Sequence, residues 1–269
     1  MPLVRRLPGV RHTAHDVPDV ELVRTGVRTE LDHLERYRDL CGFPRGDTLP
    51  ATYPHVAAFG LHLTLMTDTA FPFEAMGLVH LRNSITQNRT IGTDERYDMR
   101  VRATSVRPHP RGSLVDLSTD VTVEGELVWH EVTTLLSRHS RGAPEMSPSA
   151  LETLDAPPGV VHWQLSGDLG RHYGAVSGDR NPIHLTALTA RALGYRKPIA
   201  HGMWTKGRCL AALHNRLPES FHVEVEFRKP VLLPTTVVLG SRVRDGAVEL
   251  GVRSAHETLT HLVGRVTPL

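Results

Sequence analysis

The feature that most constrains this sequence is an order of elements that occurs twice. In each half, a largely apolar helical stretch is followed by alternating or β-branched runs that are typical of strands. The two apolar helices are predicted at about residues 55–68 and 202–214. With 269 residues the chain is long enough for two ordinary domains, and the repetition indicates one unit used twice.

Short sequence matches support this duplication. Residues 37–43 (YRDLCGF) parallel residues 173–179 (YGAVSGD), with the tyrosine and the glycine at the same spacing. Further along, residues 54–56 (PHV) parallel residues 200–202 (AHG), and both triplets open an apolar helix. Because the two matches occur in the same order, they favour a repeat over coincidence.

The two copies differ where reactive groups are expected. Phe43 stands at the position that corresponds to Asp179, and Val56 stands at the position of Gly202. A carboxylate is thus replaced by an apolar ring, and a residue without a Cβ atom by a branched one. The first half is therefore interpreted as a copy that has lost its chemistry.

A change in composition separates the halves. Residues 138–160 read RHSRGAPEMSPSALETLDAPPGV and contain four prolines and several small polar residues. Such a stretch does not hold a regular element throughout, so it is predicted to be a linker. We expect an N-terminal domain over 1–137, the linker over 138–160 and a C-terminal domain over 161–269.

The remaining elements complete an α+β pattern. The first half adds an amphipathic helix at 31–40 and four strands at 76–85, 96–106, 113–123 and 126–136. The second half adds a strand at 160–165, a turn-rich segment at 177–184 and a short helix at 186–193. Four strands follow, at 221–230, 235–244, 247–255 and 260–269. A buried helix followed by successive antiparallel strands predicts a sheet that wraps around that helix.

Charge and motifs exclude several classes of protein. The formal net charge of +2 is too small to indicate a nucleic-acid partner. The chain has no apolar run of about 18 residues, which argues against a membrane span, and no signal-like N-terminal stretch, so we expect a cytoplasmic location. No H-E-x-x-H or C-x-x-C motif indicates a metal site, and no G-x-G-x-x-G motif indicates a Rossmann oxidoreductase.

The most informative segment is the octet SGDRNPIH over residues 177–184. Its residue types are turn formers, so Asp179 could simply close an Asx-turn and His184 could be an ordinary, partly buried histidine. The other interpretation is that the carboxylate and the imidazole form an acid–base pair. Taken alone, such a pair is more often structural than catalytic.

The octet, together with PIAHGM over residues 198–203, closely resembles the MaoC-like (R)-specific enoyl-thioester hydratases, and the similarity extends over about residues 171–213. The resemblance implies an α+β double hot-dog fold, with two antiparallel sheets each wrapped around a long central helix. Residues 54–88 resemble the degenerate repeat found in two-repeat members of this family.

The resemblance implies that Asp179 and His184 are the catalytic pair and that the backbone N–H of Gly202 forms an oxyanion hole. Hydration of a conjugated double bond needs a base that activates water at C3 and an acid that protonates C2. Negative charge develops on the thioester oxygen, which suits an N–H at the start of a helix. A glycine there lets the thioester approach closely. Which residue of the pair is the base stays open.

Other residues in or near the motifs are expected to contact the substrate. Asn181 and His201 lie within the motifs, and Asn181 can also tie the loop to its own backbone. Arg196, Lys197 and Arg208 are basic residues that could contact the phosphates of coenzyme A (CoA) or the acidic surface of an acyl carrier protein. For any single one of them, an ordinary solvated surface position is the alternative.

The sequence therefore predicts a hydro-lyase of fatty-acid metabolism that interconverts trans-2-enoyl and (R)-3-hydroxyacyl thioesters of CoA or acyl carrier protein. The resemblance implies no cofactor and no metal, and it permits a homodimer. Two alternatives stay open. A hot-dog thioesterase would hydrolyse the same substrates and release a thiol, and a non-catalytic acyl-thioester-binding subunit would bind them without turnover.

Overall fold

The computed structural model describes residues 3–6, 17–138, 149–256 and 258–269. Residues 139–148 of the predicted linker lie outside the described residues. Within the described part, no helix is long and apolar enough to cross a membrane.

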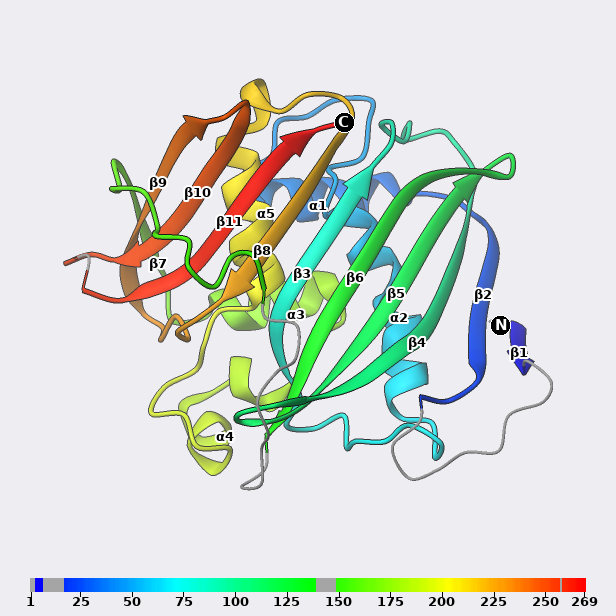
Figure 1. The fold of residues 1–269 in the computed structure, drawn as a ribbon, viewed down its shortest axis with the longest axis horizontal. Coiled ribbons are helices and arrows are strands. Elements are labelled where there is room, and N and C mark those ends of the chain that lie inside the picture. Colours follow the sequence, from blue (N-terminus) through cyan, green and yellow to red (C-terminus); the bar gives the residue numbers. More distant parts are fainter. Residues whose placement is uncertain (1–2, 7–16, 139–148, 257) are drawn as a thin grey trace. The chain divides into compact units, whose positions relative to one another are not determined.

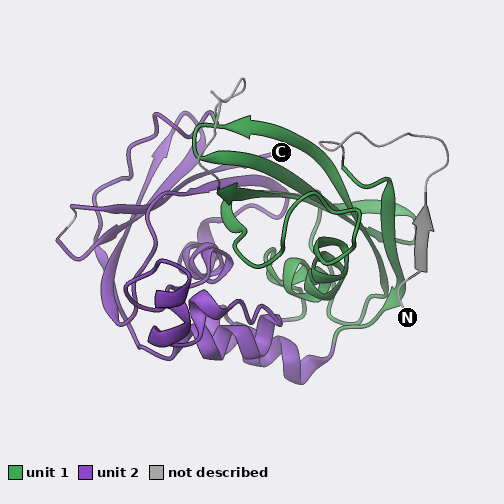
Figure 2. Ribbon diagram, turned by 90° about the horizontal axis from the view of Figure 1, so that it is seen from below, with its two compact units in different colours: residues 1–29, 47–149 green, residues 30–46, 150–269 purple. Residues whose placement is uncertain are grey.

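The chain forms two compact units, coloured separately in Figure 2. Unit 1 comprises residues 1–29 and 47–149, and unit 2 comprises residues 30–46 and 150–269. The predicted helix at 31–40 was expected with the N-terminal domain, but it belongs to unit 2. There Trp204 Nε1 donates to Leu40 O at 3.0 Å, which holds the end of this helix within unit 2.

Unit 1 is an antiparallel sheet that curves around the helix α2 (Tyr53–Met66) (Figures 1 and 2). The strand order is β1-β2-β4-β5-β6-β3. The strands are β1 (Leu3–Arg6), β2 (Val20–Val27), β3 (Val79–Gln87), β4 (Tyr97–His109), β5 (Gly112–Val123) and β6 (Glu126–Arg138). Side chains alternate between buried and more exposed along β3 and much of β4, as expected for strands with one face toward a helix.

Unit 2 repeats this plan around the helix α5 (Gly202–Ala212). Its strand order is β7-β9-β10-β11-β8. The strands are β7 (Val161–Leu165), β8 (Phe221–Phe227), β9 (Thr235–Arg244), β10 (Ala247–Ser254) and β11 (Thr260–Pro268). The other helical elements are α1 (Leu31–Cys41), α3 (Leu169–Ser177), the 3-10 turn η1 (Pro182–His184), α4 (Ala187–Ala192) and the 3-10 turn η2 (His214–Arg216).

The strand orders show the duplication directly. In chain order, β2, β3, β4, β5 and β6 occupy the same places in unit 1 as β7, β8, β9, β10 and β11 do in unit 2. One hairpin in each unit, β5–β6 in unit 1 and β9–β10 in unit 2, has the same kind of turn, although the two hairpins do not correspond in the repeat: Glu124-Gly125 and Asp245-Gly246 all have positive φ, the requirement of a two-residue type I′ turn. The predicted double hot-dog α+β fold is confirmed.

The sequence match between residues 37–43 and 173–179 also has a structural basis. Tyr37 on α1 and Tyr173 on α3 are both buried in unit 2, with ring centroids 6.5 Å apart. Gly42 and Gly178 end the two helices in the left-handed conformation, each with φ of 80°.

Among the described residues, four elements were not predicted: β1, β2, α3 and the 3-10 turn η2. Helix α3 contains two glycines within nine residues, and glycine lowers helix propensity, so its sequence gives a weak helical signal. Helix α2 begins at Tyr53, two residues earlier than predicted, because Pro54 is well suited to a first helical turn.

Candidate active site

The loop that carries Asp179 begins at the end of α3. Gly178 takes the left-handed conformation, and its N–H donates to Gly174 O at 3.1 Å, which ends the helix. The next N–H, that of Asp179, donates to Ser177 Oγ at 3.2 Å. These bonds fix the backbone that leads into Asp179, whose side chain is 30% exposed.

The side chains of Asp179 and Asn181 then shape the turn. Asp179 Oδ1 accepts the N–H of Asn181 at 3.1 Å, and Asn181 Oδ1 accepts the N–H of Ile183 at 3.3 Å. The second bond caps the turn η1, which begins at Pro182. Asn181 therefore ties the loop to its own backbone, as its sequence position indicated, and its contact with substrate stays a prediction.

His184 is buried, and a contact with the backbone determines which of its ring nitrogens carries the proton. Its Nδ1 lies 2.7 Å from Ile199 O, and a carbonyl oxygen only accepts, so Nδ1 carries the proton and Nε2 keeps a lone pair. Burial lowers the pKa of His184, while the charge of Asp179 and the bond to Ile199 O oppose that shift. The imidazole is therefore neutral near pH 7 and has a basic Nε2.

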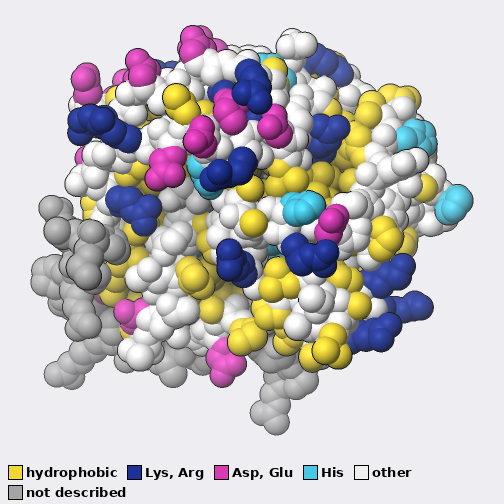
Figure 3. Space-filling view, turned by 180° about the vertical axis from the view of Figure 1, so that it is seen from behind, with side chains coloured by type: hydrophobic (Ala, Val, Ile, Leu, Met, Phe, Trp, Pro, Cys, Tyr) yellow, Lys and Arg dark blue, Asp and Glu magenta, His cyan; other side chains and the backbone are white. Residues whose placement is uncertain are grey.

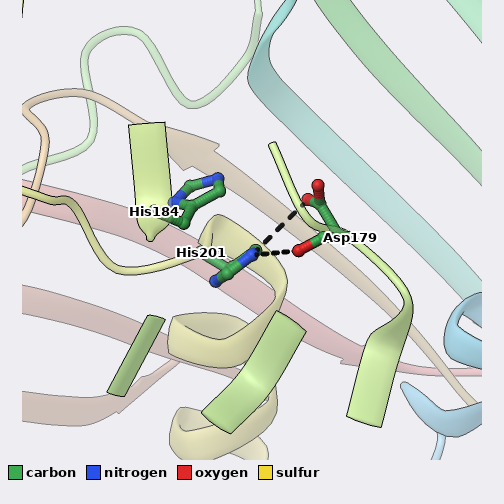
Figure 4. A group of neighbouring side chains, drawn as sticks. All are labelled: Asp179, His184 and His201. Atoms are coloured by element: carbon green, nitrogen blue, oxygen red, sulfur yellow. Dashed lines mark hydrogen bonds and ion pairs between the residues drawn. The ribbon is translucent and has the colours of Figure 1, made fainter. Parts of the chain in front are cut away.

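His201, the residue just before α5, joins the same cluster (Figure 4). Its Nε2 donates to the backbone oxygen of Asp179 at 3.0 Å and lies 3.7 Å from Asp179 Oδ2. The ring stacks on His184 with centroids 3.6 Å apart. Burial, reinforced by His184, lowers the pKa of His201 to about 3, so this ring stays neutral. Among the described residues, its Nδ1 has no hydrogen-bond partner.

Sequence reasoning missed two glycines of α3 that make this cluster compact. A Cβ atom on Gly170 would lie 2.1 Å from His184 O, and one on Gly174 would lie 2.7 Å from Asp179 O. The two glycines are four residues apart, so they share one helix face, and the loop packs directly on it. Their spacing within a short helix is the only sequence signal that could have revealed this role.

Gly202 is the first residue of α5, where N–H groups have no acceptor within the helix. Its N–H is thus available at the helix terminus that carries partial positive charge. A Cβ atom at this position would lie 3.0 Å from the ring of Phe227 on β8. A side chain at this position would therefore need the Phe227 ring to move by a few tenths of an ångström, so packing favours glycine here.

Comparisons with known proteins identify the family. Over 236 residues the chain is 38% identical to 3-hydroxyacyl-thioester dehydratase X of Mycobacterium tuberculosis, covering 87% of this chain and 84% of that protein. The profile described as "MaoC like domain" matches residues 152–262. The chain belongs to the MaoC-like dehydratase family.

Two further comparisons agree with this similarity. The crystal structure of HtdX from Mycobacterium tuberculosis superposes with a TM-score of 0.83 at 34% identity, covering 93% of this chain and all of that one. A 3-hydroxybutyryl-CoA dehydratase of Methylorubrum extorquens is 40% identical over 77 residues, 27% of this chain and 49% of that protein. The chain is therefore an enzyme, a hydro-lyase, as its octet predicted.

The basic residues predicted to contact substrate occupy two different environments. Arg196 and Lys197 are exposed and line a pocket of about 480 Å³ beside α4. Arg208 instead donates from its Nη1 to Cys41 O at 3.2 Å, and its guanidinium carbon lies 5.1 Å from the centre of the Trp163 ring. These contacts give Arg208 a packing role in unit 2, and we leave it out of the proposed site.

The cluster also has the donors of a metal site. Asp179, His184 and His201 each offer one ligand atom, and these atoms lie within 4.8 Å of one another. Carboxylate and imidazole are common zinc ligands, so the geometry could hold such an ion. The same carboxylate and neutral imidazole can equally hold one water molecule between an acceptor and a base.

Proposed function

We propose that this enzyme catalyses the reversible addition of water to trans-2-enoyl thioesters, which gives (R)-3-hydroxyacyl thioesters, without a metal or a cofactor. One observation carries the proposal: Asp179, His184 with its unprotonated Nε2, and His201 form one cluster, with ligand atoms within 4.8 Å of one another, and His201 directly precedes Gly202 at the first turn of α5. The name of its mycobacterial relative, a 3-hydroxyacyl-thioester dehydratase, supports a thioester substrate.

The tautomer of His184 favours this residue as the base. Because Nδ1 is committed to Ile199 O, Nε2 is the ring atom that can take a proton from water. The water oxygen bonds to C3 of the substrate, and the electron pair of the double bond moves toward the thioester oxygen as an enolate. The imidazolium then gives its proton to C2, so that OH is added at C3 and H at C2.

Two other groups act on this charge separation. The Asp179 carboxylate accepts a hydrogen bond from the water and stabilises the imidazolium while it exists. The Gly202 N–H at the helix terminus donates to the enolate oxygen. In the reverse direction the same groups remove the C2 proton and release water from C3, which is dehydration.

His201 serves as a positioning residue in this scheme. Its bond to Asp179 O holds the backbone of the loop, and its stacked ring supports His184. With a pKa of about 3, it does not compete for the proton that His184 receives.

The test is an assay with trans-2-enoyl-CoA substrates of short, medium and long chain, in the presence of EDTA. Loss of the conjugated-thioester absorbance is followed beside a thiol reagent, and the product's configuration is determined by chiral analysis. We expect absorbance loss without free thiol, and a decrease of about 10²–10⁴ in turnover for Asp179→Asn and for His184→Gln. Both variants should keep the wild-type circular dichroism.

Matched controls are available at exposed positions. Asp245→Asn changes a carboxylate that is 92% exposed in a turn that suits asparagine, and His172→Gln changes an exposed histidine on α3. Both should retain full activity. Near-normal turnover by Asp179→Asn would disprove the mechanism, thiol release would indicate the thioesterase, and tight binding without turnover would indicate the binding subunit.

A further inference from the structure

Residues 150–159, which we call the strap, belong to the predicted linker and pack against the sheet of unit 2. In Figure 1 the strap runs in front of β10 and β11, whereas α5 lies behind the same strands. After the strap, the N–H of Val160 donates to Leu239 O at 3.0 Å and the chain enters β7. The strap thus crosses the outer face of the sheet, which is the face opposite α5. One apolar cluster buries strap residues against β11: Leu151, Leu154, Ala156 and Val263.

Glycines on two neighbouring strands make room for the strap. Gly240 on β9 and Gly251 on β10 lie directly opposite each other in the sheet. A Cβ atom on Gly251 would lie 2.3 Å from Ala156 Cβ, and one on Gly240 would lie 2.3 Å from Pro157 O. Real Cβ atoms essentially never make contacts this short, and glycine inside a strand often marks the close approach of another segment. The strap therefore lies directly on the backbone of the sheet.

Two arginines of unit 2 hold the strap by its backbone. Arg228, which directly follows β8, donates from its Nη2 to Leu151 O at 2.7 Å and to Glu152 O at 2.9 Å. Arg253 on β10 donates from its Nη2 to Ala156 O. A guanidinium has several N–H donors, and here they satisfy carbonyl oxygens at the start and in the middle of the strap. The path of the strap is therefore fixed by polar bonds as well as by apolar contacts.

The chemistry of the outer face changes beside the strap. Under the strap, one row across the strands includes Val263, Gly251 and Gly240. Two residues away along each strand, the next row on the same face is charged. From β8 to β9 this charged row reads Glu224, Arg265, Glu249 and Arg242. The two arginine side chains of the row are 39% and 42% exposed, so they lie beside the strap and not under it.

In unit 1 the corresponding face is polar. Arg100, Asp120 and His130 lie in one row across β4, β5 and β6. His130 Nδ1 is 2.6 Å from Asp120 Oδ1, and these two side chains are 35% and 27% exposed. A polar face of this kind is stable in water, whereas a contiguous apolar strip favours contact with another surface. In unit 2 the strap provides that contact from within the same chain.

We propose that the strap closes a self-association surface on the outer face of unit 2, and that a second copy of this chain docks there when the strap is displaced. Two sheets pack face to face about 10 Å apart with nearly aligned strands. A copy rotated about a two-fold axis parallel to the strands presents the charged row in reverse order. Glu224 then faces Arg242, and the two inner positions likewise bring a carboxylate opposite a guanidinium.

The order of the charges is what favours a copy of the same chain as the partner. The helix side of the molecule, shown in Figure 3, exposes hydrophobic, basic and acidic side chains in a mixture. On the strap side, by contrast, the charges alternate in sign across four adjacent strands. Because this surface lies on the face opposite α5, the inference does not depend on the proposed function.

Displacing the strap without altering the strands tests the proposal. The double variant Leu151→Ser/Leu154→Ser removes the apolar anchors of the strap and leaves the outer face of the sheet unchanged. We expect faster cleavage after Glu152 by a glutamate-specific protease, and a molar mass by light scattering about twice that of the wild type. Leu188→Ser is the control, because Leu188 is 80% exposed and lies outside the strap. It should change neither the cleavage nor the mass.

Gly251→Val displaces the strap from the other side of the contact. The new side chain would meet Ala156 Cβ at 2.3 Å, so the strap must leave, while valine itself suits a strand. Cleavage after Glu152 and the molar mass should both rise, as in the double variant. Ser84→Val is the matched control, because it adds the same side chain in the middle of β3, on the outer face of unit 1. It should behave like the wild type.

A change in the charged row distinguishes docking of a second copy from unspecific aggregation. Glu224→Lys, added to the strap double variant, places a positive charge opposite Arg242 of the second copy. The molar mass should then return to that of the wild type while the cleavage stays fast.

Four results would overturn the proposal. They are fast cleavage with an unchanged mass, association that persists after Glu224→Lys, and a strap that stays protected in both displaced variants. The fourth is loss of the wild-type circular dichroism in both displaced variants, which would make the strap a folding element instead of a cover.

Discussion

The two units place a histidine at the start of their central helices, but they use it differently. In unit 1, the Nδ1 of His55 lies 2.9 and 3.0 Å from the two carboxylate oxygens of Glu131, which is fully buried. Asn83 Nδ2 adds a bond to Glu131 Oε1 at 2.6 Å. His62, two turns further along α2, bonds Thr119 Oγ1 at 2.7 Å. These polar groups are satisfied by other groups of the protein.

In unit 2, the corresponding histidine is His201, and it lies in a cluster where some ring nitrogens make no hydrogen bond to the protein. His201 bonds a backbone oxygen, and its Nδ1 has no partner among the described residues. Asp179 is partly exposed, and Nε2 of the neighbouring His184 retains a lone pair. Buried polar groups are normally paired, because an unmade hydrogen bond is costly. Unit 1 follows that rule, whereas unit 2 keeps acceptors for water and substrate.

This difference shows how the same fold can hold a stabilising polar network in one unit and a candidate active site in the other. The polar groups of unit 1 are paired within the chain and therefore contribute to stability. In unit 2, His201 Nδ1 has no hydrogen-bond partner among the described residues and His184 Nε2 keeps a lone pair, close to the first turn of α5, where a helix terminus can stabilise developing negative charge. The two copies therefore differ in more than Phe43 and Val56 at the positions of the proposed site residues Asp179 and Gly202. Unit 1 also has a closed polar network around His55.

The replacement Glu131→Gln should have the largest effect on stability. It leaves His55 buried without its carboxylate, and breaking a buried pair costs about 3–5 kcal/mol. Burial alone would raise the pKa of Glu131, but His55 and Asn83 hold it at about 2, so the native state contains the carboxylate. Urea unfolding should show the loss, while activity per folded molecule stays unchanged.

Glu126→Gln is the matched control, because Glu126 lies on the same strand, is 65% exposed and makes only a long contact with Arg89. It should change the unfolding free energy by less than about 1 kcal/mol. If Glu131→Gln were as stable as the wild type, or were folded and inactive, the separation between a structural and a catalytic unit would fail.

Gly170→Ala tests how closely the catalytic loop must pack on α3. The new Cβ atom would lie 2.1 Å from His184 O, so the loop must move, at a cost of about 1–3 kcal/mol. A displacement of about 1 Å at a reacting group can reduce turnover by about 10²-fold, so activity should fall more than stability suggests. Gly46→Ala is the control, because a Cβ atom there meets nothing within 4 Å. Equal kcat values for the two variants would contradict this role.

The octet shows what the sequence could establish about the site. Turn chemistry and acid–base chemistry were competing interpretations of Asp179, and the structure supports the first while leaving room for the second. One oxygen, Oδ1, closes the turn to Asn181, and the other, Oδ2, faces His201. Both interpretations rested on residues close together in the chain, which is why local patterns could identify them.

Contacts between residues far apart in the chain could not be predicted from the sequence. Nothing local connects His55 with Glu131, which are 76 residues apart, or indicates that His184 stacks on His201. The glycines of α3 were missed for a related reason, since their value depends on which backbone packs against them. Alternating strands and apolar helices, by contrast, are set by burial along one element, so the fold could be predicted.

The pH dependence should separate the base from its neutral neighbour. A base must be unprotonated, and burial lowers the pKa of His184 below its ordinary value of 6.5. The value of kcat/KM should therefore stay level as the pH falls to 6.5 and decline by about tenfold per unit only below the lowered pKa. Rapid assays, with circular dichroism at each pH to check folding, measure this profile. An acid limb centred at or above 6.5 would assign the base to another group.

The smallest expected effect comes from the same kind of substitution in the other unit. Gly60 lies within α2, and a Cβ atom there would meet only the guanidinium of Arg24, at an ordinary 3.6 Å. Replacing a helical glycine by alanine without a clash should stabilise unit 1 by about 0.5–1 kcal/mol, because the unfolded chain loses freedom. Thermal unfolding should show a small rise in the Tm, with kcat unchanged.

Glycine in α3 permits a close approach of backbone to backbone, whereas glycine in α2 permits no contact that alanine would prevent. If Gly60→Ala instead lowered both stability and kcat, α2 would be as closely coupled to catalysis as α3, and the contrast between the units would not hold.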